Sequence, residues 1–233
     1  MFAYRHPVPR AIPDVARHLA WFAFVCCIAF LVPYLGVSVL DLQHDVFYLA
    51  YFAVTIALVA TYVRTEQVDV TELFRRRWRW SLAVGVIVAG LLVFNVFNTE
   101  DATPRPQGAY FVFELLWRGV GYGIVDTLLL TIFPSLVAYK LLHGRVAGLK
   151  GKARFTALGL PLVLIVTATY HWGYPQYRED GLSRPETGNV LISIPTFATA
   201  NPAGSVVAHV SQHVAAVTHA NESRIFNPPV TKR

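Results

Sequence analysis

Residues 109–142 read AYFVFELLWRGVGYGIVDTLLLTIFPSLVAYKLL. The segment is almost wholly apolar and is longer than the roughly 20 apolar residues with which a helix crosses a lipid bilayer. It nevertheless carries Glu114 and Arg118 four residues apart, and Asp126 further along. Charged groups are costly in hydrocarbon, so in membrane segments they usually face the interior of a bundle or an aqueous cavity. The segment therefore predicts a membrane helix with an inward-facing polar stripe.

The rest of the chain has the composition of a membrane protein. Hydrophobic residues make up 55% of its 233 residues and charged residues only 15%, whereas about a quarter of the residues of a soluble domain are charged. The apolar residues lie in blocks that predict spans at 18–40, 46–63, 80–98, 109–142 and 155–172. The composition therefore predicts an all-α polytopic membrane protein.

The apolar segment 189–219 is interrupted by the residues Asn201-Pro202-Ala203-Gly204. It forms either one long bent span or two shorter helices, so the whole chain is expected to be a bundle of six to seven transmembrane helices. We divide the chain into an N-terminal three-helix membrane region (1–108), a core that carries the polar motifs (109–219) and a polar tail (220–233).

Lysine and arginine alternate between the two sides of the predicted bundle. From the N-terminus through the successive loops they number 3, 0, 5, 1, 5 and 2, with Lys140 counted in the fifth group. Basic residues near span ends mark the cytoplasmic side, so we expect a cell-membrane protein with a cytoplasmic N-terminus. The net charge of +6 then reflects loops that attract anionic lipid. Membrane lipid is an expected partner, nucleic acid is not, and the pattern indicates no particular oligomeric state.

Four polar side chains form a stripe along 109–142: Glu114, Arg118, Tyr122 and Asp126. Each step of four residues drifts by about 40° around an α-helix, so the four span about 120° of one face. Glu114 and Arg118 are close enough to pair. The pair is either a structural salt bridge that pins the helix in the bundle or part of a functional site.

Three histidines lie in the apolar segments beyond this stripe. His171, in TATYHWGY (167–174), ends the fifth predicted span, where it is either an interfacial residue among aromatic anchors or a site residue. His209 and His213 lie one helical turn apart. They either pack between helices through hydrogen bonds or bind a metal, as two imidazoles at this spacing can; His171 and Glu114 are then candidates to complete the set.

The order of these motifs resembles the CAAX protease and bacteriocin-processing (CPBP, or Abi) family of intramembrane proteases. The family's first motif is Glu-Glu-x-x-x-Arg-Gly, and FELLWRG supplies Glu114, Arg118 and Gly119. The resemblance covers residues 109–219 and implies a CPBP-like C-terminal core.

The second and third family motifs are matched in part. Phe-x-x-x-His is represented by TATYH, with Thr167 in the place of Phe and His171 as the histidine. His-x-x-x-Asn is represented by His213 and Val217. In the first motif, Phe113 stands where the family has its first Glu, which is expected to activate water, and Val217 replaces an Asn expected to help stabilise the oxyanion.

The resemblance implies a metal-independent intramembrane peptidase that hydrolyses a peptide bond near the membrane surface, with a protein or peptide substrate, no cofactor and no metal. Glu114 is the expected base that activates water, since peptide hydrolysis needs a base and an oxyanion donor. The full expected catalytic set is Glu114, Arg118, His171 and His213, with possible support from His209, Tyr122 and Asp126.

Two alternatives remain open. Phe113 and Val217 favour a catalytically inactive membrane scaffold or chaperone with the CPBP fold. The histidines allow a His-ligated haem or metal protein.

The expected site has one geometric condition. Under the charge-derived orientation, Glu114 and His171 lie at the same depth. His209 and His213 join them only if the 201–204 break reverses the chain. This convergent arrangement predicts seven helices, a short sixth helix and an extracytoplasmic C-terminus.

Overall fold

The computed structural model describes residues 13–223 and 225–226, and within these residues the regular secondary structure is entirely helical. The charge predictions that involve Arg5, Arg10 and most of the 220–233 tail fall outside the described residues. The predicted all-α class is confirmed.

Five helices are long and apolar enough to cross a membrane, which supports an integral membrane protein. They agree with the five predicted spans, although the fifth begins at Gly148 because its basic first turns are helical as well. The helices are α1 (Pro13–Pro33) with its extension η1 (Tyr34–Val39), α2 (His44–Thr65), α4 (Trp78–Thr99), the continuous segment Gly108–Leu141, and α8 (Gly148–Trp172).

The Gly108–Leu141 segment is the central helix of the bundle. In an apolar stretch of 18 residues within it, 78% of the residues are buried, against 33–39% in the corresponding stretches of the other four long helices. It consists of α5 (Gly108–Glu114), η2 (Leu115–Gly121), α6 (Tyr122–Thr127), η3 (Leu128–Ile132) and α7 (Phe133–Leu141). The segments η2 and η3 are π-helical, a geometry that is frequent at functional sites. They flank the short stretch that carries Asp126.

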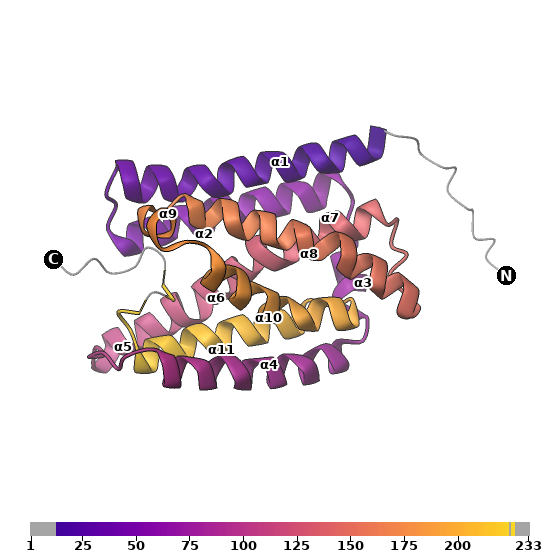
Figure 1. Cartoon of the computed structure of the whole chain (residues 1–233). Coiled ribbons are helices and arrows are strands. Elements are labelled where there is room, and N and C mark those ends of the chain that lie inside the picture. The colour runs from indigo at the N-terminus through magenta and orange to yellow at the C-terminus, as the bar shows by residue number, and fades with distance from the viewer. Residues whose placement is uncertain (1–12, 224, 227–233) are drawn as a thin grey trace.

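The apolar tail forms two helices, α10 (Ser183–Thr199) and α11 (Ala203–His219), joined by a three-residue reversal in which Ala200 has a φ of +58°. Of the two alternatives for this segment, the reversal is therefore correct. In Figure 1, α1, α2 and α8 lie on one side of the central helix, and α4, α10 and α11 lie on the other. Two short helices, α3 (Val70–Arg75) and α9 (Pro175–Asp180), complete the described fold.

Helix α11 packs directly against the backbones of α4 and the central helix. A Cβ atom on Gly204 would lie 2.0 Å from the carbonyl oxygen of Ser81, and one on Gly123 would lie 2.9 Å from the Cα of Val210. Small residues permit this close approach between membrane helices. The contacts hold the His209–His213 face of α11 against the polar stripe.

The reversal before α11 is anchored by Asn201. Its side-chain Nδ2 lies 3.1, 2.7 and 2.6 Å from the carbonyl oxygens of Leu73, Phe74 and Arg76 at the end of α3. Its Oδ1 accepts a hydrogen bond of 2.8 Å from the backbone N–H of Ala203. One buried amide thus connects the start of α11 to the α3–α4 connection.

Replacing Asn201 by alanine is expected to lower the free energy of unfolding by about 1–3 kcal/mol, because buried carbonyl groups lose their donor. The measurement is the midpoint of thermal unfolding of the purified protein in detergent. Asn98→Ala is the matched control, since Asn98 is exposed and, among the described residues, its side chain bonds within its own helix, to the carbonyl oxygen of Phe94. Equal midpoints for the two variants would contradict the anchoring role.

Candidate functional site

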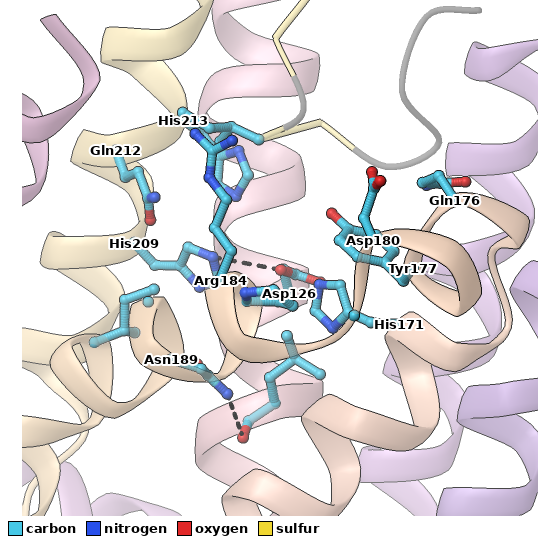
Figure 2. Close-up of a pocket in the computed structure, with 16 residues that line it drawn as sticks. Asp126, His171, Gln176, Tyr177, Asp180, Arg184, Asn189, His209, Gln212 and His213 are labelled. Atoms are coloured by element: carbon cyan, nitrogen blue, oxygen red, sulfur yellow. Dashed lines mark hydrogen bonds and ion pairs between the residues drawn. The ribbon is translucent and has the colours of Figure 1, made fainter. Parts of the chain in front are cut away.

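A cavity of about 340 Å³ lies between the central helix, the end of α8, and helices α9 to α11. Its volume is within the usual range for small-ligand pockets. Its polar lining includes Asp126 and the three histidines His171, His209 and His213, as Figure 2 shows. Exposed residues of α9 and α10 also line the cavity, so it reaches the surface at that end of the bundle.

Asp126 is the buried acidic group of the cavity and is 4% exposed. Tyr51 of α2 donates a hydrogen bond of 2.7 Å to its Oδ1. The other carboxylate oxygen, Oδ2, lies 3.3 Å from Nε2 of His209. Asp126 is therefore held from one side by α2 while it faces α11 on the other.

An aromatic layer positions the Tyr51 hydroxyl. Tyr51 stacks on Tyr170 of α8 with ring centroids 5.2 Å apart. The Tyr170 hydroxyl lies 3.0 Å from that of Tyr122 and accepts a hydrogen bond of 2.7 Å from Tyr174. Tyr122, which was expected to support the site, thus belongs to the layer that braces Asp126.

The tautomer of His209 follows from its neighbour Thr127. The Thr127 hydroxyl donates its only hydrogen to the carbonyl oxygen of Gly123, 2.6 Å away. Its oxygen, 3.1 Å from Nδ1 of His209, can then act only as an acceptor. His209 therefore carries its proton on Nδ1 and presents the lone pair of Nε2 to Asp126.

His171 is oriented in a similar way. Its Nδ1 lies 2.8 Å from the carbonyl oxygen of Thr167, which only accepts, so Nδ1 carries the proton. His171 is 5% exposed, whereas the neighbouring Trp172 is 47% exposed. His171 is thus a buried cavity residue, and the exposed residue at this end of α8 is Trp172.

His213 has an unusual environment. It is 2% exposed, and neither ring nitrogen has a hydrogen-bond partner among the described residues. Its ring centroid lies 4.8 Å from that of His209 and 4.9 Å from that of Tyr122. Buried polar groups are nearly always paired, so two unpaired nitrogens on one side chain call for a ligand.

Glu114 and Arg118 form a separate buried pair beside the cavity. Arg118 donates to Oε1 of Glu114 at 3.3 Å, which confirms the predicted pairing. Asn221, just beyond α11, donates to Oε2 at 2.7 Å. Phe226 connects the two groups, because its ring lies 5.8 Å from the Arg118 guanidinium and 5.6 Å from the His213 ring.

The structure brings together only part of the expected site. His171, His209, His213 and Asp126 line one cavity, but Glu114 and Arg118 are not among its lining residues. The acid at the histidines is thus Asp126, which was expected only in a supporting role. Sequence reasoning missed several polar partners, all on or next to apolar segments: Tyr51, Thr127, Asn189 and Asn221.

Two of the three positions that depart from the CPBP pattern, Phe113 and Val217, are packed as apolar residues. Phe113 is 43% exposed, and its ring stacks on Trp117 with centroids 6.1 Å apart. Val217 is fully buried in a cluster with Val96 and Phe226. Neither position supplies a polar group to the cavity.

Comparison with known proteins gives no match to a family model, a curated protein or a solved structure.

Proposed function

We propose that the protein is an intramembrane hydrolase of the peptidase class. It uses water in the described cavity to cleave a peptide bond near the membrane surface. The observation that supports this proposal is the gathering of one buried carboxylate and three buried imidazoles around a single cavity in an apolar bundle. The choice of a peptide as substrate rests on the CPBP-like order of the motifs.

In the proposed reaction the cavity side chains activate the water. His171 has its Nε2 lone pair available, because Nδ1 is committed to Thr167, and it acts as the general base. His213 faces the same cavity and is the candidate donor to the developing oxyanion. Glu114 has both carboxylate oxygens engaged, so in this proposal it positions the site through Arg118 and Phe226.

The proposal places the protein in the cell membrane with its N-terminus in the cytoplasm. The support is the alternation of basic residues along the loops. The mouth of the cavity, with Asp180, Gly181 and Arg184 among its lining residues, belongs to a weakly basic loop. Water and the substrate then meet at the extracytoplasmic end of the bundle.

A second candidate function is a non-enzymatic scaffold with the same helical arrangement. The apolar packing of Phe113 and Val217 favours it, because both replace residues that the family motifs use for chemistry. The two candidates differ in what a substitution inside the cavity does to the cell.

The test compares cells that carry His171→Ala with unmodified cells. We expect full-length precursor proteins to accumulate in the membrane and secreted proteome of the variant, because the base is lost. His143→Asn is the control, since His143 is exposed and has a φ of +51°, which asparagine tolerates. An unchanged proteome, with the His171→Ala protein folded and at its normal level, would reject the hydrolase and favour the scaffold.

A further inference from the structure

We propose that Asp126, His209 and His213 form a binding site for a divalent transition metal, of which zinc fits best. One ligand atom from each residue lies within 4.8 Å of the other two, and all three side chains are buried. The site goes beyond the proposed function, because a metal bound here is independent of whether the protein hydrolyses anything. Two imidazoles and a carboxylate are also the donor set of several catalytic zinc sites.

The spacing of the first two ligands suits a tetrahedral ion. Two ligands that each lie about 2.0–2.1 Å from a tetrahedral zinc are about 3.3–3.4 Å apart. Oδ2 of Asp126 and Nε2 of His209 are 3.3 Å apart. The His213 ring lies beside His209 on the next turn of α11, with centroids 4.8 Å apart.

Hydrogen bonds orient the Asp126 and His209 side chains in the way that metal ligands are oriented. Because Nδ1 of His209 donates to Thr127, its Nε2 presents a lone pair toward a carboxylate oxygen. Two lone pairs at this distance repel each other unless a proton or a metal ion lies between them. Thr127 on His209 and Tyr51 on Asp126 act as the outer hydrogen bonds that orient metal ligands.

His213 supplies the third and independent observation. Both of its nitrogens are buried and have no hydrogen-bond partner among the described residues, which is rare for a polar group at this burial. Coordination through one nitrogen gives that nitrogen a partner. Three protein ligands leave a fourth position for water, as in catalytic zinc sites. If the proposed hydrolase function holds, this water would be the nucleophile, and His171, which lines the same cavity, its base.

The direct test is the metal content of the full chain, purified in detergent without chelators. We expect about one zinc per chain, the stoichiometry of a single tetrahedral site. The double variant His209→Ala/His213→Ala should lose it, and the control His143→Asn should keep it. Protein stripped of metal and loaded with Co²⁺ should show the visible absorption bands of tetrahedral cobalt. A wild-type metal content equal to that of the double variant, together with no cobalt bands, would overturn the proposal.

Thr127 allows a test that does not remove a ligand. Thr127→Val deletes the acceptor for Nδ1 of His209 and should weaken zinc binding about 10–100-fold. Thr127→Ser keeps the hydroxyl and should bind as the wild type does. Competition with a chromophoric chelator measures the affinity. Equal affinities for the valine and serine variants would contradict the orienting role on which the site depends.

The failures of the two proposals are distinguishable. His171→Ala keeps all three proposed ligands, so it should retain zinc even where precursors accumulate. Bound zinc with an unchanged proteome would reject the hydrolase and keep the metal site. Accumulated precursors in the absence of bound metal would reject the metal site and keep the hydrolase.

Discussion

Replacing Glu114 by leucine is expected to lower the free energy of unfolding by about 3–5 kcal/mol, because it leaves a buried arginine without its partner. The Arg118 side chain is only 11% exposed and that of Glu114 only 5%. The substitution also removes the acceptor for Asn221. The measurement is the thermal or denaturant unfolding of the purified protein in detergent.

The double variant Glu114→Leu/Arg118→Met should recover most of the lost stability, since an apolar pair often replaces a buried ion pair without cost. Glu72→Leu is the control, because its partners Arg75 and Arg76 are 80% and 38% exposed at the side chain. An exposed pair is worth about 0–1 kcal/mol. Similar losses in Glu114→Leu and Glu72→Leu would contradict the buried-pair argument.

The same double variant separates structure from chemistry at this pair. If it folds and still processes the precursors that accumulate with His171→Ala, then Glu114 and Arg118 only support the fold. If it folds and processing stops, the pair takes part in the reaction or positions the groups that do.

Replacing Gly204 by alanine is expected to cost about 3 kcal/mol or more, at the upper end of overpacking effects. The added Cβ atom would lie 2.0 Å from the oxygen and 2.7 Å from the carbon of the Ser81 carbonyl group. These are backbone atoms within a helix, so they cannot move aside as a flexible side chain can. Helix α11 must therefore shift away from α4 and carry His209 away from Asp126.

Gly90→Ala is the matched control, because it lies in the same helix pair and its added Cβ meets nothing within 4 Å. It should leave stability unchanged or raise it slightly, since alanine is the better helix former. Unfolding midpoints and zinc content of both variants are the measurements. A Gly204→Ala protein as stable as Gly90→Ala would refute the close packing of α11.

Hydropathy and charge alone predicted the five long helices, because a membrane helix satisfies its backbone hydrogen bonds within itself, whatever its neighbours are. The Glu114–Arg118 contact was also predictable, since it lies within one helix. The break at 201–204 left two arrangements open, and the family-like order of the three polar motifs favoured the reversal that lets the histidines converge.

The choice of Asp126 over Glu114 as the acid at the histidines could not be read from periodicity. The stripe on the central helix offers both, and the packing of α11 decides which of them His209 meets. A signal for that packing was present in Gly119-x-x-x-Gly123, a spacing of small residues that favours close helix contacts in membranes. Gly123 meets Val210, one residue from His209, and Gly119 meets Val214, one residue from His213. Asn221 lies beyond the helix end, where no periodicity applies.

The glycine contacts of α11 also bear on how this chain can change over evolution. Where backbone meets backbone, the position of the histidines is set by atoms that every amino acid shares. On α4 the outer face is freely exposed, with Ile87 at 66% and Phe94 at 68%, while the opposite face carries Ser81 and Gly85 against Gly204. At most of the exposed apolar positions one apolar residue can therefore replace another during evolution. A few glycine positions, in contrast, must be kept because they hold the cavity residues in place.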